Sequence, residues 1–374
     1  MSTRVTVAEA MLEVYNNRYP GSVPLGIYTR YLPRSAVERE VRNLGMGIID
    51  YYPTATMIGP PWHFYEGYLS EVKNTELKVR HLWRNGKRTE RREWETPVGT
   101  ISGEIEFDPA GAGSEHIIKR YIAEPEDYKI MEYIVENTVI RSNEQSVLRR
   151  MEELGGDGLL LGRMDRSPYQ KCLIEFAGPE RFLIDLFAEP ELVRPLLEAL
   201  ERKIDEQFLI AVESEVPVLW QPDNVTSDMT PPNAFSEHCV PFYKKHQAEA
   251  AKAGKPYVVH IDGKVKVLRD EIKEAGFDVL ESVSIPDMGG DVEIPEAQEL
   301  FPETVILPNF PSNWSSLEDD RLSRKVREML ESFEPDRAVM LQISEDVPSK
   351  EWRRIFPVIA QAVRDFNGNE GDFR

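Results

Sequence analysis

The stretch VVHIDGKVKVLRDEIKEAGFDVLESVSIP, residues 258–286, contains a β-type run, a helical segment and a second β-type run. After the first run, Val265, Leu268 and Ile272 fall at i, i+3 and i+7 with charged residues between them, a spacing that predicts an amphipathic helix. Gly276 stands where a helix-ending glycine is expected, and the apolar run 277–285 predicts the next strand. The stretch therefore predicts one strand–helix–strand unit of a parallel sheet.

The same unit recurs along the chain. Apolar runs, each followed by a segment with helical periodicity, occur in the second half at 216–224, 256–263, 277–285, 303–310 and 337–346. Three more candidate strands lie earlier, at 23–32, 46–52 and 157–164. Eight strands alternating with helices predict a (β/α)₈ TIM barrel, formed by residues 1–374 as a single domain. A doubly wound open sheet is the alternative, but no G-x-G-x-x-G motif follows a first strand.

One segment in the N-terminal third interrupts this pattern. Residues 76–107 alternate around Asn85-Gly86, a pair typical of a type I′ hairpin turn, and continue through a Pro97/Gly99 turn into a third run. We therefore predict an inserted antiparallel β-hairpin element. It either decorates the rim of the barrel or serves as a lid or partner-docking surface.

Composition restricts the class of protein and its partners. The 374 residues are 41% hydrophobic, enough for a full core, and 65 acidic against 45 basic side chains give a net charge of −20. That charge repels phosphate backbones and anionic membranes, so neither nucleic acid nor a membrane is an expected partner. Only two cysteines occur, no basic and apolar leader opens the sequence, and no run of 18 apolar residues is present. A cytoplasmic protein is expected.

Polar residues gather where the predicted strands end. Because side chains alternate along a strand, His260 and Asp262 share a face with Val258, and we expect that face to point into the barrel mouth, where this fold places catalytic groups. Neighbouring runs end with similar chemistry, at Asp223, Asn224, Glu281, Asn309 and Glu345. So many acids around one opening require protons, hydrogen bonds or a cation to neutralise them.

A zinc ion is one hypothesis for that cation, with His260, Asp262 and Glu345 as its ligands at an open catalytic site. Glu281 is then a fourth ligand or the group that orients His260, and Asp223 is a further catalytic candidate. The alternative for His260 is a hydrogen-bonded pair without metal, and the alternative for Glu281 is a buried acid bonded to His260 or to a backbone amide. Asp223 and Asn224 could instead cap the next helix.

Substrate contacts are predicted at four positions. Trp62 belongs to the aromatic cluster GPPWHFYEG on a loop after the second strand, although core packing explains such a cluster equally well. Arg30 ends the first strand and could hold a substrate carboxylate bidentately, or form an ion pair with one of the acids. Asn224 and Asn309 complete the predicted substrate-binding set.

The segments HIDGKVKVLRDEIKEAGFDVLE, LPNFP and ISEDVPSKEWRRI, with others between residues 20 and 365, resemble the uroporphyrinogen decarboxylase superfamily. The resemblance is closer to the decarboxylase-like branch that includes corrinoid-dependent methyltransferases. It implies a (β/α)₈ barrel and, in the methyltransferases, zinc held by a His-x-Cys pair at the fifth strand and a Cys at the eighth. His260 matches the histidine, but Asp262 stands at the first cysteine position and Glu345 lies near the second.

These replacements make the implied site rich in oxygen, which suits an oxygen-bearing methyl donor better than a thiol. The sequence thus predicts a zinc-dependent methyltransferase acting between a small methylated or methoxylated substrate and a corrinoid. No Asp-x-His-x-x-Gly segment is present, so the corrinoid is expected on a partner protein. Homodimerisation is left open.

Two alternatives remain. One is a decarboxylase acting on a tetrapyrrole, for which only RYLP (30–33) of the family's arginine-rich MRQAGRYLPEY-type segment is kept. The other is a non-catalytic ligand-binding barrel.

Overall fold

The computed structural model describes residues 5–60, 70–107 and 115–368. Its central sheet has eight strands, and every pairing between them is parallel. The strands are β1 (Leu25–Tyr28), β2 (Met46–Pro53), β7 (Gly158–Arg163), β8 (Val218–Val225), β9 (Tyr257–Ile261), β10 (Val279–Val283), β11 (Val305–Pro308) and β12 (Leu341–Ile343).

The sheet curves into a nearly closed barrel. Its order is β11-β10-β9-β8-β7-β2-β1-β12, and a parallel bridge between Asn309 and Gln342 joins the two end strands. The backbone N–H of Phe310 also donates to the Gln342 carbonyl, at 2.8 Å. The predicted (β/α)₈ barrel is confirmed, and the open doubly wound sheet is wrong because the two ends of the sheet meet.

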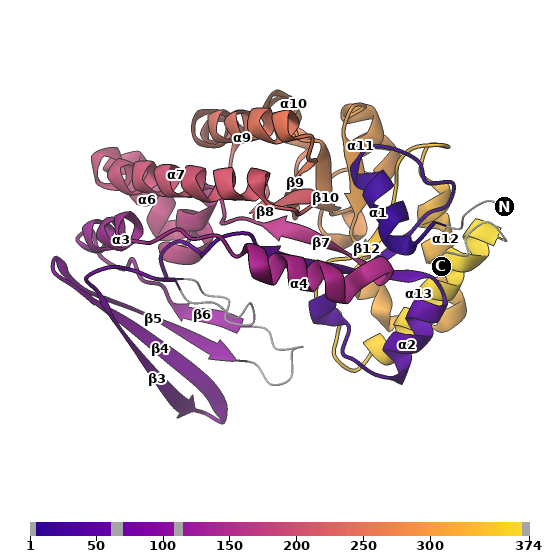
Figure 1. Ribbon diagram of the computed structural model, residues 1–374, viewed down its shortest axis with the longest axis horizontal. Coiled ribbons are helices and arrows are strands. Elements are labelled where there is room, and N and C mark those ends of the chain that lie inside the picture. The colour runs from indigo at the N-terminus through magenta and orange to yellow at the C-terminus, as the bar shows by residue number, and fades with distance from the viewer. Residues whose placement is uncertain (1–4, 61–69, 108–114, 369–374) are drawn as a thin grey trace.

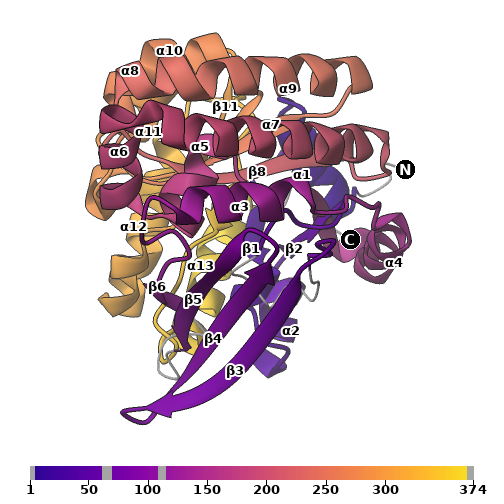
Figure 2. The ribbon, with the colours of Figure 1, turned by 90° about the vertical axis from the view of Figure 1, so that its left-hand side faces the viewer.

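Helices surround the barrel (Figures 1 and 2). They are α1 (Val7–Tyr15), α2 (Ala36–Asn43), α3 (Asp127–Glu136), α4 (Glu144–Leu154), α5 (Pro168–Gln170), α6 (Pro179–Ala188), α7 (Pro190–Glu213), α8 (Pro232–Ala234), α9 (Val240–Ala253), α10 (Arg269–Ala275), α11 (Ile294–Leu300), α12 (Asp319–Glu331) and α13 (Trp352–Asn367). Helices α9 and α10 end at Gly254 and Gly276, whose φ angles of 68° and 76° are left-handed, as the sequence predicts for helix-ending glycines.

Alternation along β9 divides its side chains between two apolar clusters. Val258 packs with barrel residues such as Leu161 and Val279, whereas Val259 and Ile261 pack in the cluster that contains α9 and α10. His260 follows Val258 on the inner face and makes its hydrogen bonds across the barrel end. The strand therefore places this imidazole at the mouth, as its alternation predicts.

The insertion forms a separate antiparallel sheet that extends from one side of the barrel (Figure 2). Its strands are β3 (Glu76–Arg84), β4 (Lys87–Thr96), β5 (Gly99–Phe107) and β6 (Glu115–Lys119), so it has one strand more than predicted. Asn85 and Gly86 have φ angles of 52° and 77°, as a type I′ turn requires. Trp94 and Ile101 pack on one face with the α3 residue Ile130, while Trp83 is 75% exposed.

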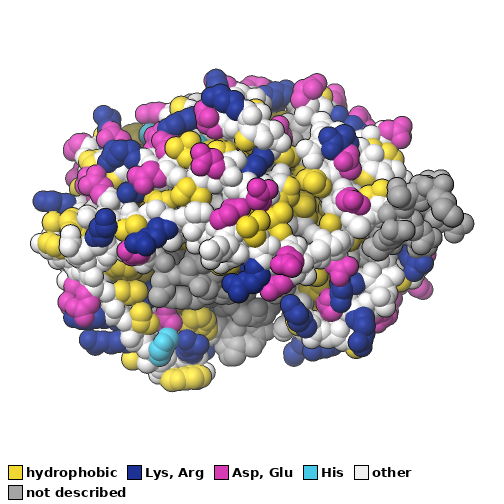
Figure 3. Space-filling view, viewed as in Figure 1, with side chains coloured by type: hydrophobic (Ala, Val, Ile, Leu, Met, Phe, Trp, Pro, Cys, Tyr) yellow, Lys and Arg dark blue, Asp and Glu magenta, His cyan; other side chains and the backbone are white. Residues whose placement is uncertain are grey.

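Acidic and basic side chains are interspersed over the face of the molecule in Figure 3. The large negative net charge is therefore not gathered into one block on this face. None of the helices in the described residues is both long and apolar enough to cross a membrane.

Candidate active site

A pocket of about 190 Å³ lies at the carboxyl ends of β1, β2, β7, β8, β9 and β12. One group of its lining residues is aromatic: Tyr28, Tyr31, Tyr51 and Trp220. The others are polar, charged or proline residues: Arg30, Arg163, Arg166, Pro222, Asn224, His260, Ser344 and Glu345. This is the end of the barrel at which the fold places reactive groups, so the pocket is the candidate active site.

At the pocket, His260 lies between two carboxylates. Its Nδ1 is 2.6 Å from Glu281 Oε2 and its Nε2 is 3.0 Å from Glu345 Oε1. His260 and Glu281 are buried, whereas the Glu345 side chain is 29% exposed. Burial alone would lower the pKa of His260, but the charges and hydrogen bonds of the two glutamates raise it to about 10. In this arrangement the ring is an imidazolium that donates from both nitrogens.

Two aromatic residues hold Glu281 in place. Tyr28 donates to Glu281 Oε1 at 2.6 Å, and the Trp220 indole N–H donates to Oε2 at 3.1 Å. Burial and the charge of Glu281 raise the pKa of Tyr28 well above its usual value, so its hydroxyl keeps the proton that it donates. Sequence reasoning missed both residues, although each lies in an apolar run that was predicted as a strand.

Irregular backbone shapes two of the strand ends. The pairing register shifts between Gln221 and Val225 of β8, and between Glu281 and Val283 of β10. Asn224 and Ser282 within these irregularities have left-handed φ angles of 51° and 65°. Such bulges change the direction of nearby side chains and are frequent next to active sites.

Arg30, Asn224, His260 and Glu345 of the predicted site line the pocket, and Glu281 contacts His260 directly behind it. Arg30 Nη2 also lies 3.9 Å from Asp346, so the ion pair offered as its alternative is present as well. Trp62 lies outside the described residues.

Three residues of the predicted site, Asp262, Asn309 and Asp223, are not among the residues that line the pocket. Asp262 accepts a hydrogen bond from Ser284, at 3.1 Å. The Asn309 side chain accepts from the backbone N–H and the hydroxyl of Ser344, at 3.1 and 3.0 Å, and so supports a residue of the lining.

Asp223 is fully buried behind β8. It accepts from the Tyr243 hydroxyl at 2.6 Å and from the backbone N–H of Ser167 at 2.8 Å. Burial raises the pKa of Asp223, and these hydrogen bonds partly offset the increase. The side chain ties β8 to the segment before α5 and is not part of the pocket lining.

A zinc ion can be compared with the donor atoms present. His260 Nε2 and Glu345 Oε1 both reach the pocket, and Glu281 binds the opposite ring nitrogen, as carboxylates do behind metal-bound histidines. His260 and Glu345 are the residues that would hold zinc at the pocket. Asp262 is bonded elsewhere, and within the described ranges no three His, Cys, Asp or Glu side chains are grouped to hold a metal ion. The described residues therefore offer zinc two protein ligands at the pocket, His260 and Glu345, one fewer than the three usual at a catalytic zinc site.

Comparisons with known proteins agree with the resemblance noted in the sequence. The uroporphyrinogen decarboxylase (URO-D) family model matches residues 172–342, which include β8 to β11 and reach into β12, and confirms the resemblance over these residues. Among solved structures the chain is similar to a "methyltransferase from Methanosarcina mazei", at 16% identity and a TM-score of 0.50, over 68% of this chain and 73% of that one. At this identity the likeness is one of fold. The search of curated proteins found no match.

Proposed function

We propose that this protein is an enzyme that transfers a methyl group between a small substrate and a corrinoid carried by a partner protein. The observation that carries the proposal is the Glu281–His260–Glu345 chain, buried at its first two members, which presents one imidazole nitrogen and one carboxylate oxygen to a small pocket. The URO-D family match and the fold shared with a methyltransferase are consistent with it.

The chain's own residues would position and shield the substrate. Glu281, held by Tyr28 and Trp220, fixes the direction of the His260 ring. Fixed polar groups at the reacting atoms need no rearrangement during reaction, and the aromatic wall keeps water from the apolar part of a bound molecule. Glu345 is the more exposed partner of His260, so it is the group with room to move when a ligand enters.

His260 and Glu345 would hold zinc, with Glu281 orienting His260. Bound zinc would supply Lewis acidity that lowers the basicity of the substrate heteroatom as its methyl group leaves. The corrinoid would accept or donate that methyl group at the open end of the barrel.

Metal analysis of three variants tests this proposal. We expect about one zinc per wild-type chain and loss of zinc in His260→Gln and in Glu345→Gln. His246→Gln is the matched control, because His246 is a buried histidine paired with Asp205 outside the pocket, at 3.1 Å. The wild-type protein should also change the visible spectrum of a cobalt(I) corrinoid protein supplied with a methylated substrate. Metal-free wild-type protein that leaves that spectrum unchanged would overturn the proposal.

Decarboxylation is the second candidate, since three arginines in the pocket suit a carboxylate substrate. The pocket volume of about 190 Å³ lies below the roughly 300–1,000 Å³ usual for ligand sites, which disfavours a tetrapyrrole. Turnover of uro- or coproporphyrinogen by metal-free protein would favour this candidate over methyl transfer. A protein that binds ligands but shows neither activity would be the non-catalytic barrel.

A further inference from the structure

The charges that line the pocket are mainly positive. Arg163 ends β7, Arg166 follows three residues later, and Arg30 lies in the short helix after β1 (Thr29–Tyr31). Among the described residues of the lining, Glu345 is the only carboxylate, and it is already paired with His260. A ligand that entered this space would meet both guanidinium groups and aromatic rings. Arg163 pairs in register with Trp220, and the Arg30 guanidinium lies 4.9 Å from the centroid of the Tyr31 ring.

Arg166 is held rigidly. Its Nε donates to Glu175 Oε1 at 3.2 Å, and its Nη1 donates to the Pro222 carbonyl and to Asn224 Oδ1, the latter at 3.1 Å. Its Nη2 makes no hydrogen bond to any residue that the structure describes. Although Arg166 is only 8% exposed, it reaches the pocket, so Nη2 is the donor left for a ligand.

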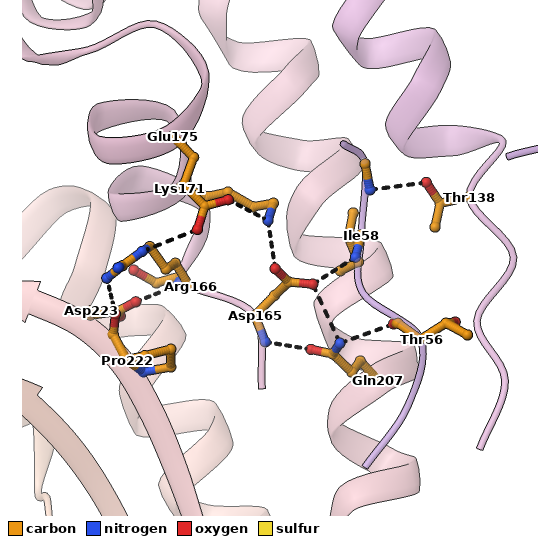
Figure 4. Close-up of polar contacts among 12 residues, drawn as sticks. Thr56, Ile58, Thr138, Asp165, Arg166, Lys171, Glu175, Gln207, Pro222 and Asp223 are labelled. Carbon is orange, nitrogen blue, oxygen red and sulfur yellow. Dashed lines mark hydrogen bonds and ion pairs between the residues drawn. The ribbon is translucent and has the colours of Figure 1, made fainter. Parts of the chain in front are cut away.

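The counterion of Arg166 is Glu175, which is buried and is not among the lining residues of the pocket; Figure 4 shows its contacts with Arg166 and Lys171. The second oxygen of Glu175 accepts from Lys171 at 3.0 Å, and Lys171 also bonds Asp165. Asp165 in turn accepts from the backbone N–H of Ile58, at 2.6 Å. Burial alone would lower the pKa of Lys171, but Asp165 and Glu175 raise it, which keeps the lysine charged. This buried network fixes Arg166 before any ligand arrives, so binding requires little further ordering.

Three aromatic residues of the lining, Tyr28, Tyr51 and Trp220, pack together. Trp220 lies 5.0 Å from Tyr51 and 6.0 Å from Tyr28, measured between ring centroids. Such a wall suits a flat or short apolar body. The volume of about 190 Å³ is equivalent to roughly six water molecules at their liquid volume, so the ligand must be small.

We infer that this pocket binds a small molecule with one carboxylate group and an apolar body. Arg166, through Nη2, and Arg163 bind the carboxylate, and Trp220 and Tyr51 cover the apolar part. The binding of such a molecule does not depend on the proposed function. Only its identification as the substrate of methyl transfer rests on that function. The inference deepens that function by naming the chemical class of the substrate.

Calorimetric titration of two matched probe pairs tests the inference. The pairs are benzoate with benzyl alcohol, and propionate with propan-1-ol, which differ in the carboxylate but little in the apolar body. At least one acid should bind wild-type protein about tenfold or more tightly than its alcohol, because hydrogen bonds to charged groups contribute about 1.5–3 kcal/mol. Two acids that bind no better than their alcohols, or no binding at all, would overturn the inference without any variant.

Arg166→Met should abolish the preference for the acid and leave alcohol binding unchanged. Lys171 then faces both Asp165 and Glu175, so this variant should also lose some stability. Arg181→Met is the control, because Arg181 pairs with Asp185 on α6, outside the pocket lining, and should keep the preference. Thermal unfolding checks that both variants fold. If Arg166→Met folds and still binds the acid more tightly than the alcohol, the carboxylate does not bind at Arg166, which contradicts the inference.

These titrations use metal-free protein without corrinoid, so the two hypotheses can fail separately. Acid binding without methyl transfer would keep this inference and remove the proposed function. Methyl transfer from a neutral substrate, with no preference for the acid, would do the reverse.

Discussion

Replacing Lys171 by methionine should strongly destabilise the protein. Lys171 is fully buried and is the cation that joins Asp165 to Glu175. Without it Glu175 keeps Arg166, but Asp165 keeps only neutral partners, the Ile58 N–H and the Gln207 amide. Breaking a buried ion pair by removing one member costs about 3–5 kcal/mol, because the remaining charge is left in a medium of low dielectric. We expect a loss of this size in the free energy of unfolding.

Urea unfolding of Lys171→Met and of a surface control measures the effect. Lys244→Met is the control, because Lys244 makes a similar contact with Glu274, at 3.0 Å, between exposed side chains. Surface pairs contribute about 1 kcal/mol or less. Adding Asp165→Asn to Lys171→Met should recover part of the loss by removing the stranded charge. If Lys171→Met lowers the free energy of unfolding no more than Lys244→Met does, then Lys171 is not needed to neutralise Asp165 in the folded protein.

Three further predictions concern single groups. In metal-free protein, Glu281→Gln should lower the free energy of unfolding by about 1.5–3 kcal/mol. Glu281→Ala should lower it further, because the buried donors of Tyr28, Trp220 and His260 then have no acceptor at this position. Equal losses for the two variants in urea unfolding would contradict this prediction. Gly290→Ala should lower the melting temperature, since a Cβ at Gly290 would lie 1.7 Å from the Ser284 carbonyl oxygen, and an unchanged melting curve would show that the loop moves freely. Burial would raise the pKa of Asp205, but hydrogen bonds from His246 and Lys245 lower it. The ionised Asp205 carboxylate therefore stabilises the fold fully above about pH 4, the pKa of an unfolded aspartate, and this stabilisation is lost as the pH falls through the lower pKa of the folded state. The melting temperature of Asp205→Asn should therefore lie below that of wild type at pH 7, and the difference should shrink as the pH falls below about 4. A difference that stays constant with pH would assign the effect to packing.

The barrel was predictable because its strands are buried on both faces. A strand of this kind reads as a short apolar run whatever its neighbours are, and all eight predicted runs contain strands. Strand β6 was not predicted, because its five residues EHIIK follow no turn sequence as clear as Asn85-Gly86. The insertion was therefore recognised from its turns, and its last strand is known only from the pairing with β5.

The arginines of the pocket could have been found from sequence. In DGLLLGRMDR, Arg163 directly follows an apolar strand, which is the same pattern that selected His260. Within the network behind Arg166, the Lys171–Glu175 pair has the i, i+4 spacing of a helical ion pair. The contacts that bring Arg166 to Glu175 and to the Pro222 carbonyl depend on tertiary packing and could not be predicted from the sequence.

Alternation explains which predicted side chains reach the pocket and which do not. On β8, Trp220, Pro222 and Asn224 all line the pocket, so strict alternation places Asp223 on the opposite face, where it bonds Tyr243. The sequence alone could have separated Asp223 from Asn224 by this rule.

The rule fails on β10. Val279 packs in the cluster of the barrel residues, yet Val283 packs in the cluster that contains α9 and α10, because Ser282 between Glu281 and Val283 is left-handed. No glycine marks that position, so the sequence predicts an uninterrupted strand. A polar residue beyond such a bulge can be assigned to a strand end from the sequence, but the direction of its side chain is decided by the backbone conformation of one serine.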